Sequence, residues 1–130
     1  MKAIRRHVAI GAFLFAAVGV AAATNLTIHL QDSAPIQRVI VQFQCDAQGA
    51  KMGLPTSPFS VEYINGAGNS LAVLPIRGKS LIFANVIAGS GARYAAGEYI
   101  WWEEAGRTVS LSSDSLAGKM RSECHRVKSK

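Results

Sequence analysis

Alternation of apolar and polar residues is the feature that most limits what this chain can fold into. Between residues 38 and 45, Val39, Val41 and Phe43 occupy every second position, and Gln42 and Gln44 stand between them. The same period of two recurs in short runs along most of the chain after residue 23, where no convincing helical spacing is found. Successive side chains of a β-strand point to opposite faces, so the pattern predicts strands that each bury one face. The sequence therefore predicts an all-β fold.

Turn-forming residues divide the chain into strands, with a turn signal about every 8 to 12 residues. The clearest hairpin loop is the Gly- and Asn-rich segment at 65–69. Pro75 interrupts one run and, lacking an N–H donor, predicts an edge or a bulge. Residues 46–56 contain Gly and Pro and are only weakly patterned, and the chain beyond Ser113 is predicted as a polar, basic tail with a frayed end. The strands are expected at 24–31, 38–45, 59–64, 70–77, 80–88, 99–103 and 108–112, with a further short segment around Tyr94.

About eight short strands at this spacing suggest an antiparallel sandwich or barrel. Closing the sheet into a barrel removes exposed strand edges, which favours the barrel for a small exported protein. The prediction is a small eight-stranded antiparallel β-barrel closed by one disulfide, in a single domain of residues 24–130.

Residues 1–23 have the pattern of a secretory signal peptide. A basic start at Lys2, Arg5 and Arg6 precedes an apolar run at 8–20 and three alanines. The apolar run is shorter than the roughly 20 residues needed to span a bilayer, so cleavage before Thr24 is expected rather than anchoring. The expected location is the bacterial periplasm. No cysteine follows the run closely enough to be acylated, so the mature chain is expected not to be membrane-anchored.

Two cysteines, Cys45 and Cys124, are the only ones in the chain. In an oxidising compartment such a pair predicts one disulfide, which would close a loop of 80 residues counting both cysteines. The chain-entropy relation assigns about 4.5 kcal/mol to a loop of that length. A metal site that adds His125 is the alternative, but the spacing C-x-x-C typical of zinc sites is missing. No metal and no cofactor are predicted.

Charge gives limited information about partners. The first 23 residues hold three basic residues and no acidic one, so removing them lowers the formal charge from +6 to +3. A chain this mildly basic, without interleaved aromatic and basic residues, does not predict nucleic-acid binding. It slightly favours an acidic partner.

Catalytic signatures are missing from the sequence. Neither His29 nor His125 stands in a nucleophile motif, and the adjacent acids Glu103 and Glu104 would point to opposite faces of a strand. A charged pair that keeps a turn soluble is the simpler interpretation of these two glutamates. The sequence therefore predicts a protein that is not an enzyme.

The segment from Ser90 to Leu111 holds most of what can be argued about function. It contains a polar loop, a double tryptophan and a second turn. One indole of Trp101 and Trp102 is expected inside the fold, and the other is expected over a barrel end or against a partner. Arg93 and Arg107 flank the aromatic strand and carry guanidinium groups suited to carboxylates.

These residues resemble the periplasmic and membrane-bound inhibitors of C-type lysozyme. The elements that match, in order, are F-Q-C at 43–45, F-S-V-E-Y-I-N at 59–65, S-G-A-R-Y at 90–94, Tyr99, the double tryptophan at 101–102, V-S-L at 109–111, and Cys124. The resemblance implies an eight-stranded barrel that binds C-type lysozyme as its protein partner. It also implies that a loop carrying Ser90 enters the cleft of the enzyme, supported by Tyr94, and that Tyr99 opens a second binding motif.

This second motif departs from the family pattern. Where the family has T-K-G, the chain has Glu103, Glu104 and Ala105. A carboxylate in place of the lysine would face the carboxylates of a glycosidase cleft, with a repulsion of about 1 kcal/mol per pair in water. The hypothesis is that Arg107 or Arg93 supplies the cation. The predicted partner-binding residues are Ser90, Gly91, Arg93, Tyr94, Tyr99, Glu104 and Arg107.

Two questions stay open at this level. A small envelope barrel that binds an apolar ligand or another envelope partner is the alternative function, and large inward residues such as Phe43 and Phe83 argue against a vacant interior. Monomer and dimer are both compatible with the sequence.

Overall fold

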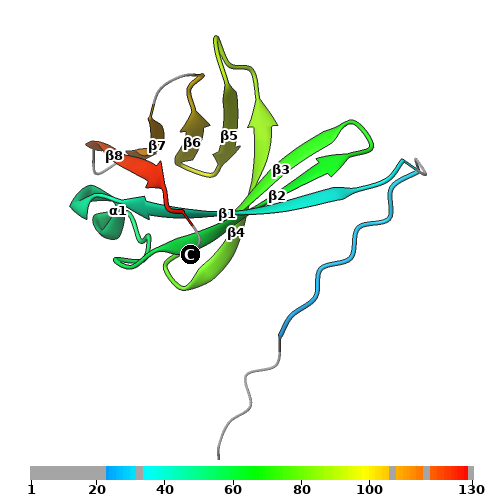
Figure 1. Cartoon of the computed structure of the whole chain (residues 1–130), viewed down its shortest axis with the longest axis horizontal. Helices are drawn as coiled ribbons and strands as arrows, with labels where there is room; N and C mark the ends of the chain where they lie inside the picture. Colours follow the sequence, from blue (N-terminus) through cyan, green and yellow to red (C-terminus); the bar gives the residue numbers. More distant parts are fainter. Residues whose placement is uncertain (1–22, 32–33, 106–107, 116–117, 129–130) are drawn as a thin grey trace, which may run out of the picture.

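The computed structural model describes residues 23–31, 34–105, 108–115 and 118–128, which form a single barrel with one short helix (Figure 1). The alternating runs are strands, as predicted. The elements in chain order are β1 (Gln37–Cys45), α1 (Ala47–Lys51), β2 (Phe59–Gly66), β3 (Asn69–Ile76), β4 (Lys79–Val86), β5 (Ala92–Ala96), β6 (Tyr99–Glu103), β7 (Val109–Ser115) and β8 (Gly118–Arg126).

Each strand pairs antiparallel with the next, and β8 returns to β1 to close the barrel. The prediction of an eight-stranded antiparallel barrel is confirmed. The β1–β8 seam is short, with three paired positions that begin at Phe43 opposite Arg126 and end at Cys45 opposite Cys124. Pro75 lies on β3 beyond the residues that pair with β2, so its missing N–H costs no bond on that side.

Aromatic and aliphatic side chains fill the interior. Trp101, Phe43 and Phe83 are fully buried, and the rings of Phe43 and Trp101 meet edge to face with centroids 5.1 Å apart. Leu74 and Leu111 are buried to the same degree. A barrel of eight strands leaves a space that side chains can fill, and here they do. This packing disfavours the alternative in which the barrel holds an apolar ligand inside.

The predicted disulfide between Cys45 and Cys124 is present and ties β1 to β8. Asp46 reinforces the same seam, because its carboxylate caps α1 and accepts hydrogen bonds from the Ser122 hydroxyl at 2.7 Å and the Glu123 amide at 3.0 Å. The hydrogen bonds from Glu123 and Ser122 lower the pKa of Asp46 below its ordinary value of 3.8. The seam is thus held by a covalent bond and by an ionised side chain.

Three predictions about secondary structure were wrong. Residues 24–31 alternate like a strand but form none, and Leu26 and Ile28 are 70% and 63% exposed. None of these residues pairs with a strand of the barrel, whose eight strands begin at Gln37. The predicted basic tail is instead β8, and α1 lies in the weakly patterned stretch 46–56, where no helix was predicted.

No helix within the described ranges has the length and apolar content that crossing a membrane requires.

Candidate functional site

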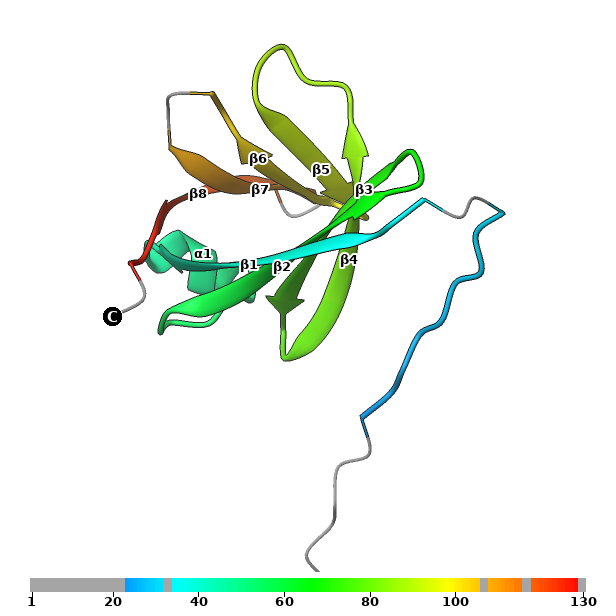
Figure 2. The same cartoon turned by 45° about the vertical axis from the view of Figure 1, so that its right-hand side comes forward.

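Two loops predicted to bind a partner lie at the same end of the barrel. Because the strands alternate in direction, the β4–β5 loop (residues 87–91) and the β6–β7 loop, described at Glu104, Ala105 and Thr108, follow strands that run the same way and lie at the same end of the barrel. Figures 1 and 2 show the β4–β5 loop at the top of the molecule, near the end of β6. The sequence predicted both segments as functional, and the fold brings them together.

Gly91 makes this contact possible. Its φ of +64° is in the left-handed region, and a Cβ at this position would lie 1.8 Å from the carbonyl oxygen of Glu103 and 2.8 Å from the amide nitrogen of Ala105. Only a residue without a side chain allows the two backbones to approach this closely. The two loops therefore form one continuous surface.

Trp102 supports the Ser90 loop from the barrel wall. Its indole Nε1 donates a hydrogen bond to the carbonyl oxygen of Ser90 at 3.0 Å. The Arg93 guanidinium lies over the Trp102 ring, 5.9 Å from its centroid, and donates to the carbonyl oxygen of Ile87 at 3.4 Å. Trp101 is the core indole and Trp102 the one near the barrel end, as the strand alternation predicted. Ser90 itself is exposed on the braced loop.

The two predicted tyrosines lie in different places. Tyr94 is buried beneath the loop end, with its hydroxyl 3.3 Å from the Ser70 hydroxyl and its ring 5.8 Å from the ring of Tyr63. Tyr99 stands at the other end of β6, next to the turn at Gly97, and is 7% exposed. The structure therefore brings Tyr94, but not Tyr99, to the end where the two loops lie.

Glu103 is the centre of a polar network that runs from the barrel interior to the surface. The Tyr63 hydroxyl donates to its Oε1, and Arg126 donates to its Oε2 at 2.7 Å. The Trp101 indole donates in turn to the Tyr63 hydroxyl at 2.8 Å. Burial and the hydrogen bond to Glu103 raise the pKa of Tyr63 well above its usual range, so this phenol remains protonated. Glu103 is 17% exposed and is not the solvated turn residue suggested by the sequence.

Glu104 also has a cation nearby. Its carboxylate is 3.9 Å from an Nη atom of Arg121 on β8, and its side chain is 14% exposed. The carboxylate of each glutamate in the pair therefore lies close to an arginine of β8. Arg107, the other predicted cation of this loop, lies outside the described residues, and its role stays a prediction.

A hollow of about 440 Å³ lies between the two loops. It is open to solvent, and its lining combines backbone from both loops with the Glu103–Arg126 pair. The lining residues are Gly91, Ala92, Glu103, Glu104, Ala105, Val109 and Arg126.

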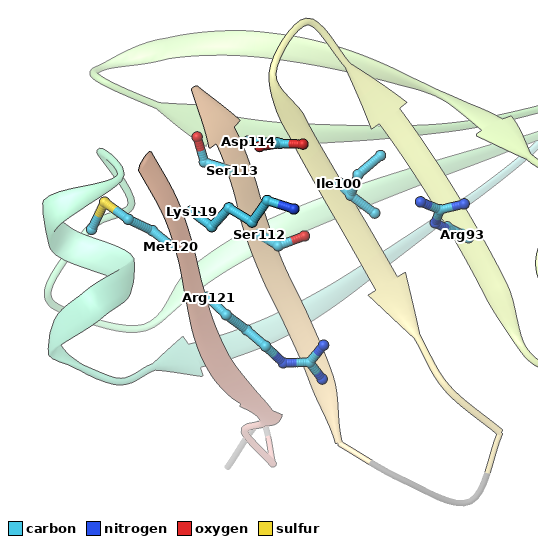
Figure 3. A pocket seen from close by; sticks show the side chains of 8 residues that line it. All are labelled: Arg93, Ile100, Ser112, Ser113, Asp114, Lys119, Met120 and Arg121. Atoms are coloured by element: carbon cyan, nitrogen blue, oxygen red, sulfur yellow. The ribbon is translucent and has the colours of Figure 1, made fainter. Parts of the chain in front are cut away.

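A second hollow, of about 380 Å³, lies on the outer wall of the barrel (Figure 3). Figure 3 shows Ile100 on β6 between Lys119 of β8 and Arg93 of β5, with Arg121 further along β8. Arg93 therefore belongs to the outer wall as well as to the support of the Ser90 loop.

Sequence reasoning missed Tyr63, Arg121 and Arg126 as parts of this end. Two of the three belong to β8, which was interpreted as a tail. The alternation of Met120, Ser122 and Cys124 was the available signal, but a serine and a cysteine in inward positions made it too weak to recognise.

Among the described residues, no group of three or more His, Cys, Asp or Glu side chains is placed to hold a metal ion.

The fold and the loop end define a class of small disulfide-closed β-barrels with a filled interior and a surface built from two neighbouring loops. Within that class, the chain belongs to the family described as membrane-bound lysozyme-inhibitor of c-type lysozyme, MliC, whose family model matches residues 43–119. The predicted family is confirmed.

Two curated relatives carry the name membrane-bound lysozyme inhibitor of C-type lysozyme. The protein of Pseudomonas aeruginosa is 50% identical over 62 residues, which cover 47% of this chain and 48% of the relative. The protein of Cupriavidus necator is 42% identical over 62 residues, which cover 48% of this chain and 43% of the relative. The matched segment spans about half the length of each relative.

Among solved structures, the chain is similar to Pseudomonas aeruginosa MliC in its crystal structure in complex with hen egg white lysozyme. The TM-score is 0.58 and the sequences are 35% identical, over 79% of this chain and 99% of that chain. The likeness therefore extends over nearly the whole length of that relative.

Proposed function

We propose that this chain is a proteinaceous inhibitor of C-type lysozyme that acts by occluding the active-site cleft and performs no catalysis of its own. The observation that carries the proposal is membership of the MliC family together with the 35% identity to a relative solved with hen egg white lysozyme. Its biological effect would be to protect bacterial peptidoglycan from the enzyme.

The loop end supplies the surface for this role. A glycosidase cleft presents two carboxyl groups, and a hydroxyl such as that of Ser90 donates hydrogen bonds to such groups. The loop is held by the Trp102 indole and by the backbone contact at Gly91 before any partner arrives. A preformed loop loses less conformational entropy on binding, which favours affinity. In this proposal Ser90, Gly91 and Tyr94 form and support the inserted loop.

The proposed location is the periplasm, after cleavage of residues 1–23. The family name places relatives at a membrane. In this chain both cysteines are joined in the disulfide, which supports a released form rather than one acylated on cysteine. Fractionation of cells that express the chain, with the mass of the recovered protein, tests both cleavage and release.

The direct test is a titration of lysozyme activity. The purified, oxidised chain is added to hen egg white lysozyme that is clearing a cell-wall suspension, and the expected result is stoichiometric loss of clearing. Ser90→Ala should weaken inhibition, whereas Ser60→Ala, on an exposed position of β2 away from the two loops, should not. A folded sample that leaves clearing unchanged at micromolar excess would overturn the proposal.

A further inference from the structure

One exposed cation stands at the rim of the hollow between the two loops. Arg126, near the end of β8, lines this hollow together with backbone of both loops, and its side chain is 64% exposed. Of the described arginines and lysines, it alone lines this hollow. Given the proposed function, we propose that the guanidinium of Arg126 recognises a carboxylate of the lysozyme cleft. Neither loop places a described arginine or lysine at this hollow.

The position of this guanidinium is fixed from within the barrel. Arg126 donates to Glu103 Oε2, and Glu103 Oε1 accepts from the buried Tyr63 hydroxyl, which in turn accepts from the Trp101 indole. The chain of hydrogen bonds links the exposed head group to a fully buried core residue. A guanidinium held in this way is pre-organised, and little side-chain freedom remains to be lost on binding.

Arg126 keeps donors for a partner. A guanidinium has five N–H donors in a planar fork, so the bond to Glu103 leaves others for a second carboxylate. Glu103 is 17% exposed, and each of its oxygens already accepts a hydrogen bond from this chain. The pair therefore presents its cation, rather than its anion, to the solvent side.

The other cations near this end face elsewhere. Arg93 lies over Trp102, and Arg121 lies near Glu104, and both line the hollow on the outer wall (Figure 3). They lie to the side of the surface formed by the two loops. This placement favours Arg126 over Arg93, which the sequence suggested for the role.

A matched control exists on the other side of β1. Arg38 is 63% exposed and pairs with Glu62 at 2.7 Å, against 64% exposure and 2.7 Å for Arg126 and Glu103. Arg38 pairs across β1 and β2 and does not line the hollow between the loops. Loss of either arginine removes the same charge and the same kind of ion pair from the molecule.

The experiment measures the affinity of the purified, oxidised chain for hen egg white lysozyme by calorimetry. We expect Arg126→Ala to weaken binding at least tenfold, Arg126→Lys to restore part of the affinity, and Arg38→Ala to change it less than twofold. Circular dichroism and thermal unfolding establish that each variant folds. If Arg126→Ala does not fold, Arg126→Gln keeps the aliphatic stem over the barrel and replaces it in the comparison.

The outcomes separate this inference from the proposed function. If the unmodified chain binds lysozyme and the two arginine variants weaken binding equally, the role of Arg126 is overturned and the proposed function stands. If the unmodified chain does not bind lysozyme at all, both are overturned. A selective loss at Arg126 supports both.

Discussion

Replacing Gly91 by alanine tests the idea that the two loops form one surface. The added Cβ would lie 1.8 Å from the Glu103 carbonyl oxygen, whereas ordinary van der Waals contact begins at 3.4 Å. The backbones must therefore separate by the difference, about 1.6 Å. Such a movement also disturbs the adjacent hydrogen bond from Trp102 to the Ser90 carbonyl.

The cost has two parts that can be separated. A left-handed backbone conformation costs an alanine about 1–2 kcal/mol relative to glycine. Loss of the hydrogen bond made by Trp102 adds about 0.5–1.5 kcal/mol. Gly97 is the control, because its φ is +56° and a Cβ there meets nothing within 4 Å. Gly97→Ala therefore carries the first cost alone, and Gly91→Ala should be less stable than it by about 1 kcal/mol.

Thermal unfolding of the two variants under identical oxidising conditions measures this difference. About 1 kcal/mol corresponds to roughly 4 °C in Tm for a domain of this size. The affinity for hen egg white lysozyme should fall at least tenfold in Gly91→Ala and stay unchanged in Gly97→Ala, since Gly97 lies at the other end of β6. Equal melting temperatures and equal affinities would show that the loops are not in backbone contact.

Three further predictions concern the closure and the interior of the barrel. The lowered pKa of Asp46 means that folding favours its ionised form, so the stabilisation is present above pH 3.8 and is lost as the pH falls through the lowered value. Asp46→Asn should accordingly lower the urea midpoint at neutral pH and by progressively less as the pH falls below 3.8, and a difference that does not shrink in acid would contradict this account. Replacing Cys45 and Cys124 by serine should cost about 2–5 kcal/mol in chemical unfolding, and an unchanged midpoint would show that the seam does not depend on the disulfide. Tyr63→Phe leaves the Trp101 indole without its acceptor and should cost about 1–3 kcal/mol in the same assay, whereas a neutral effect would argue against the network.

The barrel was predictable because the information for it is local. Alternation at Val39, Val41 and Phe43 and the turn at residues 65–69 each specify a strand or a hairpin without reference to distant residues. The strand β8 could not be predicted in this way, because the residue at its inward position, Ser122, is polar. Its burial is explained only by Asp46, to which the Ser122 hydroxyl donates a hydrogen bond. Residues 24–31 show the converse, since they alternate without pairing with any strand, so alternation alone is not sufficient for a strand.

The loop end was predictable in part for a related reason. One contiguous segment is enough to predict that Ser90 lies in a loop and that one of Trp101 and Trp102 points into the core while the other points away from it. The surroundings of Glu103 do not, because Tyr63 lies 40 residues before it and Arg126 lies 23 residues after it. The sequence alone therefore suggested that Glu103 is an exposed carboxylate. In the fold, the Glu103 side chain is only 17% exposed, and its carboxylate is paired with the exposed guanidinium of Arg126.

The short seam between β1 and β8 links the compartment of the protein to its ability to bind. Arg126 lies two positions beyond Cys124 and occupies the third paired position of this seam, opposite Phe43. The binding cation proposed above is thus placed by the pairing that the disulfide secures. A chain whose two cysteines are reduced would lack that restraint. In the proposed function, the disulfide would therefore serve to place the binding cation as well as to stabilise the barrel.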